Sequence, residues 1–323
     1  MDRRTFLQFA ASAPLALAGS RMARAQDWPQ RPIKFIVPFG PGSANDIAAR
    51  VFAEKLSPIW RQSVLVENRP GGDAIVAISA VVDANDNHML LFTGSSTFTP
   101  HPYVHEKLPY DEKRDLVPVA GVSELSIAIA VPQSLNVDSL AGLVSLVRKE
   151  PGKLNWGAIS SLDDFVFRGF LKSNGLSMSR VPYRDPISAL NDLTEARIDV
   201  CLAALALVLP RAQTRKVRAI AVTNQERSPV APDVPTVIEA SYPSLSYAPI
   251  LGIFGPRATT PATSARIASG LQTAAADPAV VSRLAPTGQV VKYVAPAEFI
   301  KSIEQERTKI AAIAKMVDIH PGE

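Results

Sequence analysis

The stretch Ile33-Lys-Phe-Ile-Val-Pro-Phe-Gly-Pro-Gly-Ser-Ala-Asn-Asp46 combines an apolar run, a turn and the first residues of a helical pattern. The apolar run at 33–37 predicts a buried strand, and Pro38, Gly40 and Gly42 predict a turn that ends it. Between residues 44 and 59, apolar side chains recur near helical spacing, which predicts a helix. A strand that turns directly into a helix is the basic unit of an α/β fold.

The same alternation of strand and helix continues along the chain. Further strands are expected at 64–67, 89–92, 154–157, 180–181, 198–203 and 217–222. Further helices are expected at 74–84, 139–149, 165–174, 187–196, 205–214, 261–276 and 296–316. Strands that alternate with helices of this length predict parallel sheets covered on both faces.

Two long extended runs, at 117–131 and 246–254, suit crossings of the chain between two lobes. On this interpretation lobe one comprises residues 28–124 and 250–323, and lobe two comprises residues 125–249. Ligands of open α/β sheets bind beyond the carboxyl ends of the strands. Two such sheets that face each other predict a ligand cleft at the hinge between the lobes.

The first 25 residues have the features of an export signal. Arg3-Arg4 is followed by an apolar run at about 9–18 and by Ala23-Arg-Ala25, a small-x-small cleavage pattern. We therefore expect a twin-arginine-type signal peptide over residues 1–25, cleavage near Ala25 and a periplasmic location. The apolar run is far shorter than the ~20 residues that span a bilayer, which argues against a membrane anchor. The alternative is a cytosolic amphipathic helix that happens to begin with two arginines.

The charge balance argues against a nucleic-acid partner. The chain carries 34 Lys and Arg residues against 30 Asp and Glu residues. Residues 1–25 contribute four arginines and one aspartate, so the remaining 298 residues hold 30 basic against 29 acidic side chains. A nucleic-acid surface requires a basic stripe. The nearly neutral remainder therefore favours a different kind of partner.

Several motifs spread along the chain resemble those of one receptor family. They are the segment from Trp28 to Arg50, Val66-Glu-Asn-Arg-Pro-Gly71, Leu108-Pro-Tyr-Asp111, Val181-Pro-Tyr183 and Arg227-Ser-Pro. Together they resemble the Bug-type extracytoplasmic solute receptors, the binding components of tripartite tricarboxylate transporters. The resemblance implies a two-lobed, type II-like periplasmic binding-protein fold that holds a small organic acid between its lobes. It also implies membrane transporter subunits as partners and, on our interpretation, a monomer without cofactor or enzymatic activity.

The resemblance places candidate ligand contacts in loops of both lobes. Glycines in the turn at 38–43 let backbone amides approach a ligand, and free amides at a helix N-terminus accept a carboxylate. The alternatives are that the turn is only a connection, that Asp46 only complements the helix dipole, and that Tyr183 only packs at the interface. The candidate ligand-binding residues are Phe39, Gly40, Gly42, Ser43, Asp46, Gly94, Ser95, Ser96, Ile159, Ser160, Ser161 and Tyr183.

The chain departs from the family pattern at places that bear on the ligand. Ser43 replaces a glycine of the first motif, and Asp163-Asp164 follow the loop of lobe two. These two carboxylates either line the cleft or cap the next helix and point outward. Carboxylates in the cleft would repel additional negative charge. The chain beyond residue 25 is nearly neutral, and the matched loops offer amides and hydroxyls more than Lys or Arg, so we expect a ligand with at most one free carboxylate. Because of the two aspartates we also expect poor binding of citrate.

The sequence shows no catalytic constellation. It has no Gly-x-Ser-x-Gly elbow and no phosphate-binding loop. Cys201, the single cysteine, lies in an apolar run that favours a buried, unreactive thiol. His101 and His105 have a spacing that metals can use, but Pro102 argues against a regular helix there, so we expect no metal site. The alternatives to a transport receptor are a periplasmic ligand sensor and a periplasmic hydrolase or isomerase.

Overall fold

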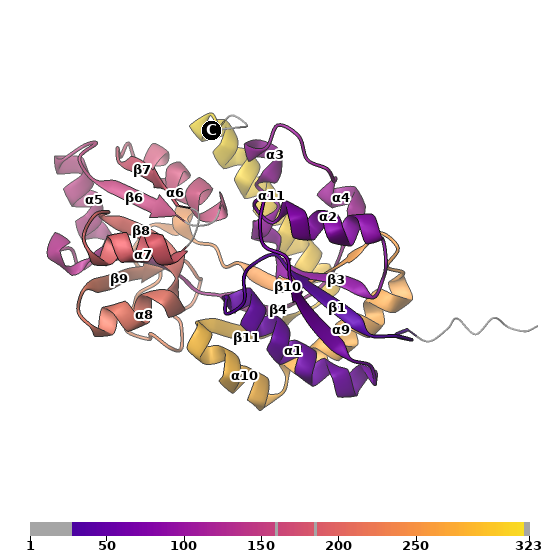
Figure 1. The fold of residues 1–323 in the computed structure, drawn as a ribbon. Helices are drawn as coiled ribbons and strands as arrows, with labels where there is room; N and C mark the ends of the chain where they lie inside the picture. Colours follow the sequence, from indigo (N-terminus) through magenta and orange to yellow (C-terminus); the bar gives the residue numbers. More distant parts are fainter. Residues whose placement is uncertain (1–27, 159–160, 184–185, 320–323) are drawn as a thin grey trace, which may run out of the picture.

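The computed structural model describes residues 28–158, 161–183 and 186–319 and shows two lobes, each built around one β-sheet (Figure 1). The first sheet has six strands in the order β11-β4-β10-β3-β1-β2, and the second has five in the order β7-β6-β8-β5-β9. Helices pack on both faces of each sheet. The molecule is therefore a two-lobed α/β protein, as the sequence indicates.

The first sheet joins a parallel part to an antiparallel part. The parallel part consists of β1 (Ile33–Val37), β2 (Val64–Asn68) and β3 (Met89–Gly94). The antiparallel part consists of β4 (Leu116–Leu125), β10 (Ile250–Pro256) and β11 (Gln289–Val294), and β10 pairs with both β3 and β4. β10 thus brings a late segment of the chain into the middle of a sheet that the early segment begins.

Alternate side chains of the first sheet pack into a core on either face, because successive residues of a strand point to opposite sides. Phe35 belongs to the core that includes α1 (Ala44–Trp60), α9 (Pro261–Ala275) and α10 (Pro278–Leu284). Ile36 belongs to the core that includes α2 (Ile75–Ala84) and the first half of α11 (Pro296–Val317). Burial on both faces explains why the strand at 33–37 is almost entirely apolar.

The second sheet repeats this plan with shorter strands. Its parallel strands are β6 (Asn155–Ala158), β7 (Ser179–Pro182) and β8 (Val200–Ala204), and its antiparallel strands are β5 (Ile127–Pro132) and β9 (Val217–Val222). One core includes α5 (Leu140–Lys149) and α6 (Ser161–Ser173), and the other includes α7 (Pro186–Thr194) and α8 (Leu205–Gln213). Cys201 is fully buried, as predicted, and burial raises the pKa of its thiol to about 12.

The structure corrects the expected elements in three ways. The run at 117–131 is two strands of different sheets, because the chain passes between the lobes at Ser126. The sheets are mixed rather than parallel, because the strands that carry the chain across run antiparallel to their neighbours. The pattern also missed β11, α10 and the short helices η1 (Ser95–Thr97), α3 (His101–Val104), α4 (Glu112–Asp115), η2 (Gln133–Leu135), η3 (Pro243–Leu245) and η4 (Ala285–Thr287).

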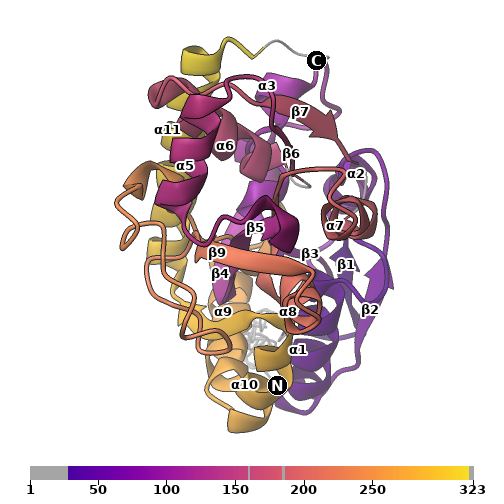
Figure 2. The same cartoon turned by 90° about the vertical axis from the view of Figure 1, so that its left-hand side faces the viewer.

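The C-terminal helix α11 packs into the cores of both lobes. Phe299 belongs to the core of the first lobe, whereas Ile310 and Ile313 belong to the core of the second. Ile313 lies against Gly169 of α6, where an added Cβ would come within 3.1 Å of the isoleucine side chain. Figure 2 shows α11 running beside α6. The last turns of α11 therefore belong to the core of lobe two, although the sequence interpretation placed 250–323 in lobe one.

Shortening a side chain of α11 tests this packing. Ile310 is fully buried, so Ile310→Ala should lower the free energy of unfolding by about 2–5 kcal/mol through lost burial and a residual cavity. Ile300 lies on the same helix but is 45% exposed, so Ile300→Ala is the matched control and should cost about 0.5 kcal/mol or less. Urea unfolding measures both values. Equal, small effects would show that the end of α11 does not belong to the core of lobe two.

Candidate ligand-binding site between the lobes

The strand registers place the carboxyl ends of the parallel strands of both sheets next to the chain crossings. Leu251 near the start of β10 pairs with Gly94 at the end of β3, and Ile127 at the start of β5 pairs with Ala204 at the end of β8. β10 begins where the chain returns from the second lobe, and only Ser126 separates β4 from β5. Both carboxyl ends therefore border the crossings, and the loops after such strands are where α/β sheets bind ligands.

The loop after β1 exposes backbone beside the first turn of α1. Phe39 is 39% exposed, and an added Cβ at Gly40 would meet no atom within 4 Å. Gly42 has a φ of +82°, a left-handed conformation that favours glycine. Ser43 caps α1, since its hydroxyl accepts a hydrogen bond of 3.2 Å from the Asp46 amide. These five candidate residues form one continuous turn at the helix N-terminus.

Asp46 is buried, and both of its oxygens accept hydrogen bonds that hold this turn. Oδ2 accepts from the Gly42 amide at 2.9 Å and from Arg50 Nε at 3.1 Å, and Oδ1 accepts from Asn68 Nδ2 at 2.9 Å. Burial by itself raises the pKa of Asp46, but the hydrogen bonds from Arg50, Gly42 and Asn68 outweigh it and lower the pKa. Asp46 therefore positions the turn. Arg50 and Asn68 are supporting residues that the sequence interpretation missed.

The turn has fewer spare backbone donors than expected. The amides of Gly42 and Ser43 already form hydrogen bonds inside the turn. The first intrahelical hydrogen bond of α1 is donated by the Ile47 amide, which leaves the amides of Ala44 and Asn45 outside the helical ladder. The amides of residues 44 and 45 are thus the better candidates for binding an anion at this edge.

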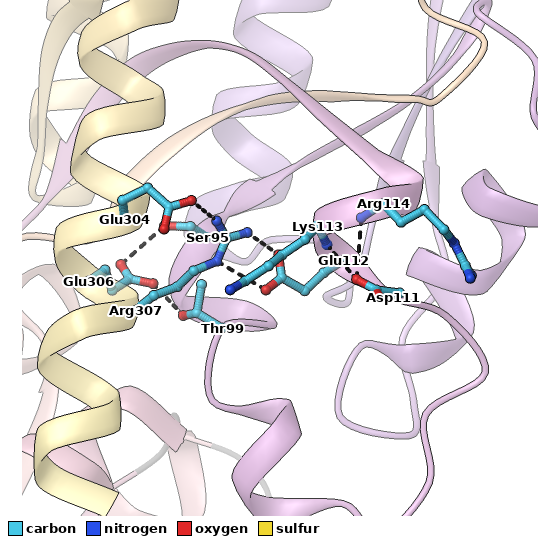
Figure 3. A network of polar contacts seen from close by, with 9 residues as sticks. All are labelled: Ser95, Thr99, Asp111, Glu112, Lys113, Arg114, Glu304, Glu306 and Arg307. Carbon is cyan, nitrogen blue, oxygen red and sulfur yellow. Dashed lines mark hydrogen bonds and ion pairs between the residues drawn. The ribbon is translucent and has the colours of Figure 1, made fainter.

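The residues that follow β3 are held by the C-terminal helix. Ser95 Oγ donates to Glu306 Oε2 at 3.0 Å, and the Thr99 hydroxyl donates to the other oxygen of Glu306 (Figure 3). Gly94 precedes η1 as its N-cap, and Ser96 is half-buried beside it. The hydroxyl of Ser95 is therefore engaged by a residue of α11, a pairing that no local pattern could indicate.

In the second lobe, Tyr183 packs against the end of β6. An added Cβ at Gly157 would come within 2.8 Å of the Tyr183 ring, and the Tyr183 hydroxyl donates to Asp192 Oδ2 at 2.8 Å. Burial and the bond to Asp192 raise the pKa of Tyr183, so its hydroxyl stays protonated. Ser161 is the first residue of α6, whereas Ile159 and Ser160 lie outside the described residues.

Asp163 and Asp164 point to different parts of the molecule. Asp164 is buried between two guanidinium groups, with Arg168 Nε 2.9 Å from Oδ2 and Arg180 bound to Oδ1. Asp163 is also buried and accepts a hydrogen bond from Tyr247 at a chain crossing. Asp164 is thus paired with two guanidinium groups, and Asp163 is held at the crossing by Tyr247. The two arginines reduce the repulsion expected of Asp164, whereas Asp163 remains a candidate to line the cleft.

Helix N-termini at both edges favour an anion. α1 follows the turn after β1, α6 follows the loop after β6, and α8 follows β8 directly. The first amides of a helix carry partial positive charge and point along its axis. Helix N-termini of this kind can hold a small carboxylate through backbone amides, without requiring lysine or arginine.

Residues 48–319 match the family model described as the tripartite tricarboxylate transporter family receptor, TctC. The chain belongs to this receptor family. The receptor is 30% identical over 312 residues to a UPF0065 protein of Bordetella bronchiseptica, and the match covers 96% of this chain and 92% of the relative.

Solved structures of the same kind match nearly the whole receptor. Rpa4515 of R. palustris with adipate has a TM-score of 0.81 and 26% identity, covering 91% of this chain and 100% of that one. MatC (Rpa3494) from Rhodopseudomonas palustris with bound malate has a TM-score of 0.76 and 25% identity, covering 90% of this chain and 99% of that one.

Buried polar groups at the crossings of the receptor were not anticipated. Ser126 is fully buried between β4 and β5, and Asn224, just after β9, is 5% exposed. Among the described residues, Ser126 Oγ and Asn224 Oδ1 have no hydrogen-bond partner. Buried polar atoms without partners are uncommon, so we add both residues to the candidate ligand contacts. The available signal was a serine that interrupts the apolar run at 117–131.

The Glu306 carboxyl makes the receptor's stability depend on pH. Burial raises its pKa from 4.5 to about 7, against the hydrogen bonds from Thr99 and Ser95, which lower it. Between these two pH values only the folded state keeps the proton on Glu306. The contribution of this proton to the free energy of unfolding is therefore complete below pH 4.5 and is lost as the pH rises through 7.

Urea unfolding between pH 4 and 9 tests this assignment. In Glu306→Gln, the free energy of unfolding should decline less between pH 4.5 and 7 than in wild type. The stability of the variant relative to wild type should therefore be higher at pH 8 than at pH 4. Glu298→Gln changes an exposed residue of the same helix and is the control. A pH profile of Glu306→Gln parallel to that of wild type would contradict the assignment.

Proposed function

We propose that the receptor captures a small carboxylate between its lobes and delivers it to the membrane subunits of a tripartite tricarboxylate-type transporter. The observation that carries the proposal is the meeting of both sets of carboxyl-end loops at the chain crossings, with helix N-termini on either side. The relatives solved with adipate and with malate support a carboxylate ligand. On this proposal the protein binds and releases its ligand as a monomer, without catalysis and without a cofactor.

The proposed ligand class is wider than the sequence suggested. The restriction to one carboxylate rested on a nearly neutral chain and on loops with few Lys or Arg, and the poor binding expected of citrate rested on repulsion by Asp163 and Asp164. Asp164 is balanced by Arg168 and Arg180, and Asp163 is bonded to Tyr247. We therefore include dicarboxylates among the proposed ligands, with an affinity on the order of micromolar.

Closure about the crossings is the proposed response to the ligand. We keep residues 28–124 with 250–323 as lobe one and 125–249 as lobe two, with the end of α11 packed on lobe two. Contacts from both edges stabilise the closed form, whose surface is then recognised by the transporter subunits.

A side chain at Gly40 tests where the ligand lies. An added Cβ at Gly40 would meet no atom within 4 Å, and the residue does not adopt the left-handed conformation that favours glycine. Gly40→Val should therefore fold normally. If the ligand lies against the first turn of α1, the valine should weaken its binding at least about 10-fold, or 1.4 kcal/mol, by steric exclusion. A thermal-shift screen of mono-, di- and tricarboxylates and amino acids first identifies the ligand, and calorimetry then compares the variants.

The control for this experiment is Ala265→Val, which adds a branched side chain at an exposed position of α9. It should bind the ligand as wild type does. Equal affinity of Gly40→Val and wild type would move the ligand away from this turn. A screen in which no carboxylate raises the melting temperature would oppose the ligand class itself.

We also propose export to the periplasm through the twin-arginine signal at residues 1–25, which lie outside the described residues. In the described part, no helix has both the length and the apolar character needed to cross a membrane. Replacing Arg3 and Arg4 together by Lys should leave the unprocessed precursor in the cytoplasm. Cell fractionation and N-terminal sequencing measure the outcome. Normal processing to a chain that starts at Gln26 would instead assign export to the general secretion route.

A further inference from the structure

Three side chains of the first lobe, from segments other than the loop after β1, lie close to one another. They are Asp73, just before α2, His101 at the start of α3, and His105 just after α3. Asp73 Oδ2 lies 3.3 Å from His101 Nε2 and 3.2 Å from His105 Nε2. All three potential ligand atoms lie within 4.8 Å of one another.

The two histidines lie one helical turn apart on the same face. The amide of His105 donates to the His101 carbonyl at 3.0 Å, which is the helical i to i+4 bond. Pro102 was expected to oppose a helix here, but it occupies the first turn of α3, where a proline costs no hydrogen bond. Histidines spaced four residues apart on a helix present their rings to a common metal ion.

His101 is oriented as a metal-ligating histidine would be. It is fully buried, and its Nδ1 lies 2.6 Å from the hydroxyl of Tyr110, which is itself buried. Its Nε2 points toward Asp73, whose Oδ2 atom is 3.3 Å away. A ligating histidine usually forms a hydrogen bond through its second nitrogen, and this bond fixes the ring. Tyr110 provides that bond here.

The backbone around Asp73 directs its carboxylate toward the histidines at a conformational cost. Asp73 and Ala74 have φ values of +52° and +69°, a left-handed conformation that is uncommon outside glycine. Such strained residues persist where the surrounding structure requires them and often lie at functional sites.

We propose that Asp73, His101 and His105 bind a divalent transition-metal ion, with zinc as the best match. Two imidazole nitrogens and one carboxylate oxygen are ligands that zinc prefers. With metal–ligand bonds of about 2.0–2.1 Å, neighbouring ligands of a tetrahedral zinc ion are about 3.3 Å apart. The two distances from Asp73 Oδ2 match this edge length. Asp73 and His105 are partly exposed, so solvent or a ligand can supply the fourth contact.

The site would fix a segment that contacts the second lobe. Tyr103 of α3 packs against Phe165 of α6, with 6.1 Å between the two ring centroids. The same segment begins with Ser95 and Thr99, which bind Glu306. A metal ion that joins α3 to the loop before α2 would therefore hold the segment from Ser95 to His105, which lies where the two lobes meet.

Zinc retention tests the proposal directly. The mature chain, prepared without a polyhistidine tag and stripped with a chelator, should take up one zinc ion per molecule, measured by elemental mass spectrometry. A zinc concentration about 100-fold above Kd should raise the melting temperature by about 5 °C. Nickel, cobalt and copper serve as competing probes.

Variants separate a metal site from a simple cluster of ion pairs. His105→Ala and Asp73→Asn should abolish stoichiometric retention, and Tyr110→Phe should weaken zinc affinity by about 10-fold while leaving all three ligands in place. His320→Ala removes a histidine outside the described residues and should bind zinc as wild type does. The proposal is overturned if wild type retains no zinc, in which case the cluster holds ion pairs only, or if the ligand variants retain zinc unchanged.

Discussion

The antiparallel pairing of β10 with β3 and of β5 with β8 constrains the rest of the structure. In each pair, one strand (β10 or β5) begins at a chain crossing. Its partner (β3 or β8) is a parallel strand that leads into a helix. The crossing strands therefore start where the parallel strands end. Because βα loops follow those ends, the candidate ligand-binding edges of both lobes and the chain crossings occupy the same region. The closure proposed above would therefore change the distance between the two edges directly.

The polar side chains at these edges mainly hold backbone in place. Asp46 accepts hydrogen bonds from the turn that precedes it, Ser95 is bound by Glu306, and Tyr183 is bound by Asp192. Each of these groups would be costly to leave unpaired when buried. On the proposed function, recognition of an anion is then left largely to helix N-termini and to the polar groups at the crossings. Such preorganised donors lose little conformational entropy when a ligand binds.

α11 links the two lobes, because its two halves are buried in different cores. The half next to the first lobe carries Glu306, which reaches the residues after β3. The other half packs against α6, whose first turn borders the second edge. One rigid helix thus touches the loops of both lobes, and motion at the crossings must be accommodated along it.

The sequence alone determined most of the longer strands and helices, the two crossings and the turn from β1 to α1. These features depend on local periodicity and on glycine and proline positions, which act over a few residues. Tertiary structure alone decided which partners the polar side chains take. Adjacent Asp163 and Asp164 are bound by Tyr247 and by Arg180, and Asp73 meets His101 only because α3 packs beside the loop before α2. Neighbouring helix positions point in different directions, and their partners come from distant segments that no local pattern relates.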